Sequence, residues 1–266
     1  MNEKELIENI EQFFRWYRQV YDSELILDHP VARVSIAEPS GPAVQKGRQG
    51  HAQTQNISRR AVQYRQTSPE LQAFYEEIRD CQQCELHKTR KNFVFGYGNA
   101  QAEVMFVGEA PGREEDEQGL PFVGAAGKLL DKMFASIGLS RDNVYIANVL
   151  KCRPPDNRDP RPEEIARCEP YLIKQIQMIK PKLIVALGRF AAQSLLRLEQ
   201  PLGVMREGDH QYQNIPVIVT YHPAALLRNP ALKQKAWQDL KKIKRFLDAR
   251  TGESDSPHPL ISPVPE

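Results

Sequence analysis

Four cysteines are the first residues whose type and spacing indicate chemistry. They form a C-x2-C pair, then 67 intervening residues, then a C-x15-C pair, at Cys81, Cys84, Cys152 and Cys168. Thiolates bind zinc and iron–sulfur clusters, and four of them in two groups predict a site that ties distant segments together. Structural zinc is a second interpretation, although zinc ribbons usually pair two close knuckles. Redox sensing by free thiols is a third.

A second group of candidate residues follows four apolar runs of the chain. Gly108–Gly112 comes after the first run, Asn148 ends the second, Gly188 follows the third, and His222 with Pro223 follows the fourth. In open α/β sheets, ligands bind outside the carboxyl ends of the parallel strands. If the four runs are parallel strands, these residues meet at one edge of the sheet. We therefore expect a binding site there.

Several of these residues have both a binding and a structural interpretation. The Asn148 amide can donate and accept, so it could read the edge of a pyrimidine. Phe122 could stack on a planar ligand, and His222 could donate to a developing oxyanion. The acidic loop from Glu109 to Asp116 could line a pocket. Each side chain could instead serve the fold alone, and the residues by themselves leave both interpretations open.

The elements that must position this site alternate between two patterns. Apolar, β-branched runs that predict buried strands lie at 103–107, 144–149, 182–187 and 216–220. Patterns with helical spacing lie at 125–137, 163–180, 189–198 and 230–248. Alternation of this kind predicts a parallel sheet covered on both faces. We expect an α/β fold, a three-layer α/β/α sandwich with a four-stranded parallel sheet.

Charge and proline patterns divide the 266-residue chain into four parts. Residues 1–28 have helical apolar spacing and predict an amphipathic helix, while residues 29–68 predict a flexible basic linker. Residues 69–250 form the predicted folded domain. Residues 251–266 are a Pro- and Ser-rich tail that we expect to be disordered.

Composition excludes several classes of protein. With 36 basic and 34 acidic residues, the net charge of +2 excludes a uniformly polycationic binder but not a local basic face. The sequence lacks an 18-residue apolar run, so we expect no membrane-spanning helix, and its start has no secretory pattern. We therefore expect a cytoplasmic protein with reduced cysteines. The glycines of 96–98 and 124–127 match neither a dinucleotide fingerprint nor a phosphate-binding loop.

Taken together, six motifs resemble the type-4 (iron–sulfur) uracil-DNA glycosylases. In order they are CQQC at 81–84, GEAPGREED at 108–116, GLPFVGAAGKLL at 119–130, NVLKCRPP at 148–155, Cys168, and HPAALLRNP at 222–230. The resemblance covers roughly residues 70–248 and implies the uracil-DNA glycosylase fold. It also implies that the four cysteines bind a [4Fe–4S] cluster.

The resemblance further assigns roles around a uracil that has been flipped out of the DNA stack. It implies that Phe122 stacks on the base, that Asn148 bonds its Watson–Crick edge, and that His222 donates to O2. Glu115 would lie near C5, where a thymine methyl would have to fit. The implied lining of the uracil and water pocket also includes Gly108, Glu109 and Ala110.

The implied reaction is hydrolysis of the glycosidic bond of deoxyuridine, which releases uracil and leaves an abasic site. Other members of the superfamily position the attacking water with an aspartate, and the matching residue here is Ala110. Glu109 is adjacent and becomes the second catalytic candidate beside His222. No lysine stands out as a Schiff-base nucleophile, so we expect a monofunctional glycosylase. The alternative is a DNA-binding iron–sulfur scaffold or redox sensor without excision activity.

The expected partner is uracil-containing DNA, single- or double-stranded. Candidate phosphate contacts near the cysteines are Lys88, Arg90, Lys91, Lys151, Arg153, Arg158 and Arg161. Leu227 and Arg228, in the segment LLR, could enter the stack that the flipped base vacates. We expect a monomer, and the 1–28 helix could bind a protein partner.

Overall fold

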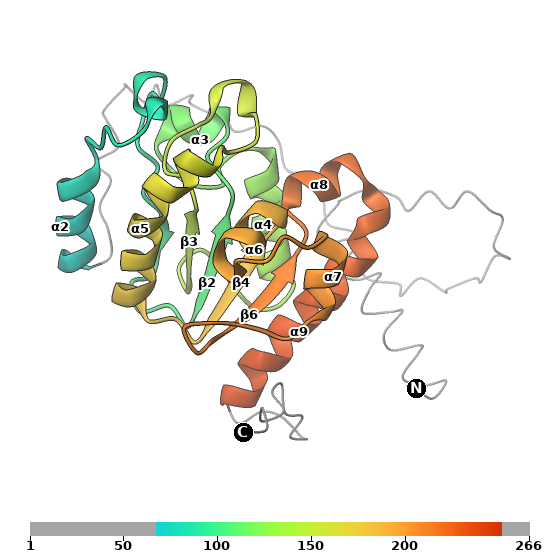
Figure 1. The fold of residues 1–266 in the computed structure, drawn as a ribbon. Helices are drawn as coiled ribbons and strands as arrows, with labels where there is room; N and C mark the ends of the chain where they lie inside the picture. The colour runs from blue at the N-terminus through green and yellow to red at the C-terminus, as the bar shows by residue number, and fades with distance from the viewer. Residues whose placement is uncertain (1–67, 252–266) are drawn as a thin grey trace, which may run out of the picture.

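A computed structural model describes residues 68–251 of the chain. The predicted helix at 1–28, and all but the last residue of the predicted linker, lie outside these residues. The tail also lies outside them, apart from Thr251, which ends the last helix. The described residues form one sheet with helices on both faces (Figure 1). The expected α/β class is therefore confirmed.

The centre of the sheet consists of four parallel strands in the order β3-β2-β4-β6. They match the four predicted runs within one residue at each end, as β2 (Val104–Gly108), β3 (Val144–Asn148), β4 (Leu183–Leu187) and β6 (Ile215–Thr220). Gly108 pairs with Asn148 in the register of β2 and β3. The carboxyl ends of the strands therefore lie together, as predicted.

The sheet has six strands rather than the four that were predicted. Two short antiparallel strands, β1 (Tyr97–Gly98) and β5 (His210–Tyr212), add to its edges. Strands of two and three residues are too short to leave an alternating pattern, which explains why the sequence did not reveal them.

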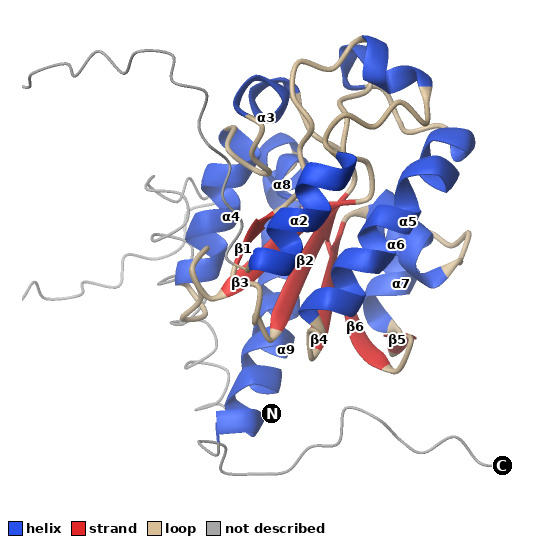
Figure 2. Ribbon diagram, turned by 90° about the vertical axis from the view of Figure 1, so that its left-hand side faces the viewer, coloured by secondary structure: helices blue, strands red, loops and turns tan. Residues whose placement is uncertain are grey.

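Helices alternate with the strands and pack on both sides of the sheet (Figure 2). They are α2 (Pro69–Ile78), α3 (Arg113–Gln118), α4 (Ala125–Ala135), α5 (Pro162–Ile179), α6 (Arg189–Leu196), α7 (Leu202–Glu207), α8 (Pro223–Arg228) and α9 (Lys233–Thr251). The predicted helix at 230–248 begins only at Lys233, after a short 3-10 turn at Pro230–Leu232. Asn229 caps that turn by accepting a hydrogen bond from the Ala231 N–H over 3.1 Å.

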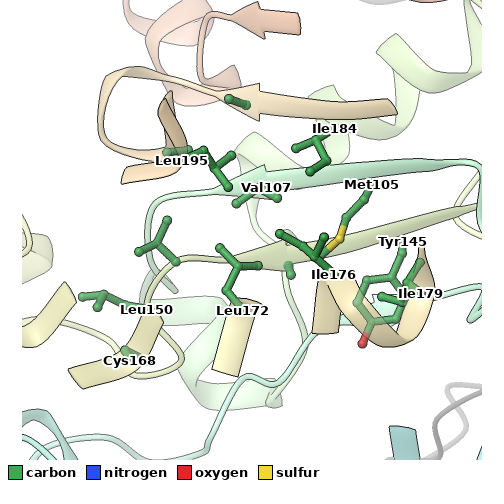
Figure 3. Close-up of a cluster of buried hydrophobic side chains, with 14 of the residues drawn as sticks. Met105, Val107, Tyr145, Leu150, Cys168, Leu172, Ile176, Ile179, Ile184 and Leu195 are labelled. Carbon is green, nitrogen blue, oxygen red and sulfur yellow. The ribbon is translucent and has the colours of Figure 1, made fainter. Parts of the chain in front are cut away.

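Two hydrophobic cores lie on opposite faces of the sheet, because neighbouring strand residues point to opposite sides. Met105 and Val107 join the core that packs against α2, α5 and α6 (Figure 3). Val104 and Phe106 join the core that packs against α4, α8 and α9. Both faces of the parallel strands are thus buried, which accounts for their continuous apolar sequence.

The acidic stretch that we expected to be a loop is one only from Glu109 to Gly112, and from Arg113 onward it forms helix α3. Gly112 is extended and precedes α3, and the Gly112 N–H donates to the Glu115 carboxylate over 3.2 Å. Carboxylates in the first turn also favour a helix because they complement its positive end. Gly119 ends α3 with a φ of 72°, a conformation that glycine adopts without strain.

Within residues 68–251, no helix has the length and apolar content that crossing a membrane requires.

Candidate active site

A pocket of about 360 Å³ opens at the carboxyl edge of the sheet. Its walls come from the ends of β2, β3 and β6, from the start of α4, from α8 and from the loop before α5. The lining consists of Glu109, Ala110, Pro111, Gly112, Glu115, Phe122, Ala126, Asn148, Pro154, Asn157, Arg158, Asp159, His222, Ala224 and Arg228. The structure therefore brings together most of the site residues predicted from sequence. Gly108 lies behind the pocket, and Leu227 is not part of the lining.

Asn148 ends β3 and has an unmet hydrogen-bonding capacity. The residue is only 2% exposed, and its Oδ1 atom finds no hydrogen-bond partner within residues 68–251. A buried carbonyl oxygen without a donor is costly, by about 1–3 kcal/mol. A ligand N–H in the pocket would remove that cost.

Gly108 provides the space that Asn148 and Phe122 occupy. A Cβ atom at position 108 would lie 2.4 Å from Asn148 Oδ1 and 2.6 Å from Phe122 Cζ. Both distances are shorter than any stable contact, so a larger residue would displace one side chain or the other. Although Gly108 does not touch the pocket, it sets the position of two residues that do.

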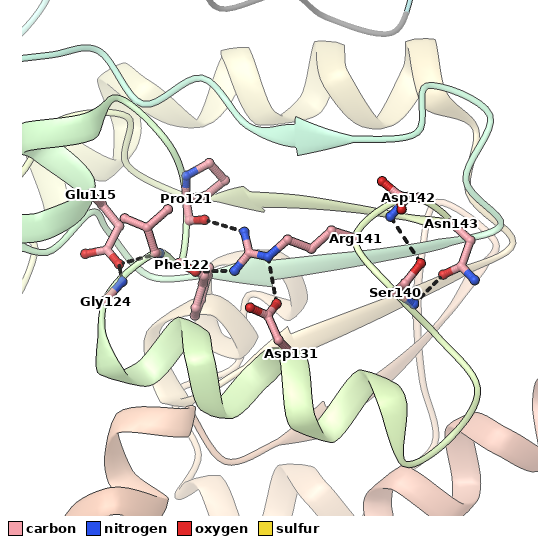
Figure 4. Close-up of polar contacts among 10 residues, drawn as sticks. Glu115, Pro121, Phe122, Gly124, Asp131, Ser140, Arg141, Asp142 and Asn143 are labelled. Carbon is pink, nitrogen blue, oxygen red and sulfur yellow. Dashed lines mark hydrogen bonds and ion pairs between the residues drawn. The ribbon is translucent and has the colours of Figure 1, made fainter. Parts of the chain in front are cut away.

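Phe122 is held in a conformation that its neighbours must stabilise. Its φ of 53° lies in the left-handed region, which costs a residue with a Cβ about 1–2 kcal/mol. The Arg141 guanidinium donates to the carbonyl oxygens of Pro121, over 3.0 Å, and Phe122, and pairs with Asp131 (Figure 4). Gly127 leaves room for the same carbonyl, because a Cβ there would lie 1.7 Å from Phe122 O.

Glu115 fixes the chain on the other side of Phe122. Its carboxylate accepts hydrogen bonds from the N–H groups of Val123 and Gly124, each over 2.9 Å (Figure 4). It also accepts from the Gly112 N–H over 3.2 Å. One carboxylate thus joins the start of α3 to the start of α4. Three hydrogen-bonded N–H groups occupy the oxygens that the resemblance placed next to a bound base.

His222 follows β6 and caps α8 with its side chain. The Ala224 N–H donates to Nδ1 over 3.2 Å, so Nδ1 acts as an acceptor and the neutral ring carries its proton on Nε2. Burial and, to a smaller extent, the nearby Arg228 charge lower the pKa of His222 to about 4. At neutral pH, His222 is therefore an uncharged imidazole with a donor on Nε2.

A buried network anchors the strand that leads to His222. Thr220, the last residue of β6, donates to Asp239 of α9 over 2.7 Å. Asp239 also forms two hydrogen bonds with Arg206 of α7, at 2.8 and 2.9 Å. Gly188, with a φ of 91°, passes against His222, since a Cβ there would lie 3.0 Å from His222 Cβ. These contacts fix the exit of β6 relative to β4 and α9.

Glu109 is the carboxyl group of the pocket whose pKa is shifted furthest from its ordinary value. Burial and, to a smaller extent, the Asp159 carboxylate raise its pKa to about 7. Arg189 and Arg228 oppose it in part. A carboxyl group with a pKa near 7 can accept a proton at neutral pH, as a general base requires.

The loop before α5 supplies a pocket wall that sequence reasoning missed. Asn157, Arg158 and Asp159 line the pocket, although we considered only Arg158, as a phosphate contact. The Arg158 guanidinium forms a bidentate pair with the buried Glu164, at 2.9 and 2.5 Å. The sequence signal that could have revealed this wall is the polar, Pro-rich segment directly after Cys152, since such segments form loops.

The four cysteines line a second, much smaller pocket below this loop. None of them forms a disulfide, and several of their sulfur atoms accept hydrogen bonds. Tyr171 Oη donates to Cys81 over 3.1 Å, and Arg90 Nη1 donates to Cys152 over 3.2 Å. The segments at 81–84 and 152–168 therefore converge, as predicted. Among the described residues, no three His, Cys, Asp or Glu side chains surround one point that could hold a single metal ion.

Lys151 was wrongly considered a phosphate contact. Its side chain is fully buried, with 0% exposure, so it cannot reach DNA. Arg90 was also expected to bind phosphate, but its guanidinium donates to the carbonyl oxygens of Cys81 and Arg79 and to the Cys152 sulfur. A basic residue next to a cysteine in sequence can belong to the cysteine site rather than to the surface.

Comparison with known proteins agrees with this geometry. The sequence profile of the uracil DNA glycosylase superfamily matches residues 95–241, which is more than half of the chain. The chain belongs to the uracil-DNA glycosylase superfamily. The superfamily match includes every lining residue of the pocket as well as Cys152 and Cys168, whereas Cys81 and Cys84 precede it.

Individual uracil-DNA glycosylases are also similar to this chain. The type-4 uracil-DNA glycosylase of Archaeoglobus fulgidus is 52% identical over 181 residues, which are 65% of this chain and 91% of that protein. The type-4 enzyme of Thermotoga maritima is 43% identical over 176 residues, 65% of this chain and 92% of that protein. A type-5 uracil-DNA glycosylase of Pyrobaculum aerophilum is 32% identical over 147 residues, which are 49% of this chain and 65% of that protein. The predicted resemblance to the type-4 group is thus confirmed.

Proposed function

We propose that the chain is a monofunctional uracil-DNA glycosylase of base excision repair, which hydrolyses the N-glycosidic bond of deoxyuridine and leaves an abasic site. The observation that carries this proposal is the unpartnered Asn148 Oδ1 in a pocket walled by Phe122 and His222, in a chain whose relatives are type-4 uracil-DNA glycosylases.

Recognition would use Asn148 and Phe122. Uracil presents a donor, N3–H, beside an acceptor, O4. The Asn148 Oδ1 atom would accept from N3–H while its amide nitrogen donates to O4. Phe122, already fixed by Arg141, would cover one face of the base. The base must leave the helical stack to reach this pocket, at a cost of a few kcal/mol.

Departure of the base would depend on His222. When the bond between C1′ and N1 breaks, its electron pair moves to uracil and negative charge accumulates on O2. The neutral His222 would donate its Nε2 proton in a hydrogen bond to that oxygen. A donor at such a position contributes about 2.7–4 kcal/mol of transition-state stabilisation. An imidazole with a pKa near 4 stays neutral throughout the physiological range.

Hydrolysis would then need a water molecule on the opposite face of the sugar. Glu109 is the carboxyl group of the pocket with a suitable pKa, about 7. It would orient the water and accept one of its protons as the remaining hydroxide bonds to C1′. The proton finally neutralises the uracil anion. Ala110 leaves this function to its neighbour because its methyl group cannot bond to water.

Glu115 would discriminate against thymine through the position of Phe122 rather than by direct contact with C5. Its carboxylate already accepts three backbone hydrogen bonds around the Phe122 segment. The backbone from Phe122 to Gly124, held by these hydrogen bonds, would therefore leave little room beside C5 for a methyl group.

The cysteine site fits a [4Fe–4S] cluster, with Cys81, Cys84, Cys152 and Cys168 as ligands. The four cysteines line one pocket, and the hydrogen-bond donors of Tyr171 and Arg90 beside them would suit thiolate ligands. Such a cluster supplies cross-links between segments and, in other proteins, electron transfer. Iron and sulfide analysis of the purified chain, with a visible absorbance spectrum, tests this proposal against zinc.

Contact with DNA would involve Leu227 and Arg228 at the rim. Leu227 is 46% exposed, an unusual exposure for a leucine, and Arg228 lines the pocket next to it. The proposal also includes a cytoplasmic site of action, where thiols stay reduced. The proposal includes action as a monomer and keeps residues 1–28, predicted from the sequence to be helical, as a candidate protein-binding segment.

The test is incubation with an oligonucleotide that contains one uracil, followed by alkali. Strand breaks at the uracil, released uracil in the supernatant, and no break in a thymine control are expected. The Asn148→Ala variant should lose most of this activity. DNA binding without strand breaks would contradict the proposal and favour the scaffold or redox-sensing alternative.

A further inference from the structure

A fully buried lysine lies between the two sites described above. Lys151 is 0% exposed, and its Nζ donates to the main-chain carbonyl of Asn148 over 2.8 Å and to Gln175 Oε1 over 2.6 Å. Gln175 is also fully buried and donates from Nε2 to the Phe95 carbonyl over 2.9 Å. The lysine side chain thus connects the end of β3 to the C-terminal part of α5.

The main chain of the same residue contacts the cysteine site. The Lys151 N–H donates to the Cys168 sulfur over 3.2 Å, and Cys168 belongs to α5. The Lys151 carbonyl accepts from the Val94 N–H over 2.9 Å. One residue therefore touches a cysteine ligand with its backbone and the pocket asparagine with its side chain.

A lysine in such a place is not explained by packing alone. Among the salt bridges of the described residues, none involves Lys151, and both of its side-chain acceptors are neutral. The fold would bury a methionine of similar length at less cost, because a buried ammonium loses its hydration. Its closest links to the cysteine site are its own main-chain N–H, which donates to Cys168, and Cys152, which follows it in the chain.

We propose that Lys151 is a positioning residue that holds Asn148 in the orientation that uracil requires and couples this orientation to the cysteine site. The proposal rests on the proposed glycosylase function. The link is mechanical: Nζ holds the Asn148 carbonyl, which sets the plane of the peptide from which the amide side chain projects. Ligation of Cys152 and Cys168 would fix α5 and the segment after β3, and would thereby also fix the base of the lysine side chain.

The test is a double-mutant cycle on the full chain with the variants Lys151→Met, Asn148→Ala and the double variant. Two quantities are measured, the single-turnover excision rate on a uracil-containing single strand and inhibition by free uracil. Visible absorbance and thermal unfolding report on the cysteine site and on the fold. Lys174→Met is the control. Lys174 is exposed on α5, the helix that carries Gln175, and pairs with Glu77.

A residue that acts through Asn148 has an effect only while Asn148 is present. Lys151→Met should slow excision by about 10- to 100-fold, the cost of a displacement of about 1 Å at a reacting centre, and should weaken inhibition by uracil. The double variant should be no slower than Asn148→Ala alone. Lys174→Met should behave like the wild type.

Multiplicative losses in the double variant, or wild-type excision by Lys151→Met, would overturn the inference. If Lys151→Met does not fold, Gln175→Met replaces it, because this variant frees the lysine from α5 and keeps its contact with Asn148. It should give a smaller loss of rate that also disappears in the Asn148→Ala background. A loss that multiplies that of Asn148→Ala would again overturn the inference. A wild type without excision activity would instead disprove the proposed function.

Discussion

The rings of Phe122 and His222 lie with their centroids 5.4 Å apart and their planes inclined by 32°. The two residues come from distant parts of the chain, one before α4 and the other after β6, and each is fixed by its own set of contacts. Their rings form adjoining walls of the pocket. A stacking surface and a hydrogen-bond donor thus stand side by side before any base enters.

The first prediction concerns the donor. His222→Ala should lower the single-turnover rate of uracil excision by about 10²- to 10³-fold, because it removes the group that stabilises the departing base. Affinity for a duplex with an abasic site should hardly change. If affinity falls and the rate with saturating enzyme does not, His222 binds DNA rather than promoting departure.

The second prediction concerns pH. Glu109 accepts a proton in the proposed mechanism, so its ionised form is the active one, and this fraction rises as pH increases through its pKa of about 7. The excision rate should therefore rise with pH and level off above 8. Near pH 6 only about one tenth of the carboxyl groups are ionised. His222 adds no second transition in this range because its pKa is about 4.

Replacement of the carboxyl group separates this interpretation from a general effect of pH on DNA binding. Glu109→Gln should be slow at every pH and should lack the rise near pH 7. Glu117→Gln is a suitable control, since Glu117 is exposed and pairs with Lys91. An unchanged pH profile in Glu109→Gln would assign the transition to another group.

A third prediction compares two glycines. Gly127→Ala places a methyl group against the Phe122 carbonyl and should destabilise the fold by about 1–3 kcal/mol, as overpacking does. It should also weaken inhibition by free uracil, because Phe122 must move. Gly203→Ala, in α7, meets no atom within 4 Å and should be neutral or stabilising by up to about 1 kcal/mol. Equal melting temperatures for the two variants would show that Phe122 is not confined as described.

A fourth prediction compares two exposed apolar residues. Leu227→Ala should slow excision from a base-paired duplex more than from a single strand, because only the duplex has a stack for the side chain to fill. Val204 is 55% exposed but lies on α7, outside the pocket lining. Val204→Ala should leave both rates unchanged. Equal losses on both substrates would mean that Leu227 does not act as a wedge.

Much of the architecture was predictable because buried parallel strands have a strong sequence pattern. Continuous apolar runs located β2, β3, β4 and β6 within one residue at each end. Helix α8 was not recognised because six residues are too few to display a helical period. Helix α3 was mistaken for a loop since its stability depends on capping by Glu115 rather than on an apolar face.

For the site, the topology made the meeting of Asn148 and His222 predictable, whereas the supporting contacts were not. Nothing in the sequence links Arg141 to the Phe122 carbonyl, which lies 19 residues earlier in the chain. For Lys151 the sequence predicts a surface charge that contacts phosphate, because lysine is rarely buried. Such contacts depend on how loops pack in three dimensions, and a periodic pattern does not report them.

The bracing of Phe122 by Arg141, Glu115 and Gly127 has a consequence for the energetics of base capture. The chain orders this wall when it folds, so a base that enters does not have to freeze a loop. The entropy of capture is then dominated by the nucleotide leaving its stack. Undamaged DNA and damaged DNA meet the same rigid shape, and selectivity arises from how readily each base leaves the helix and whether it fits.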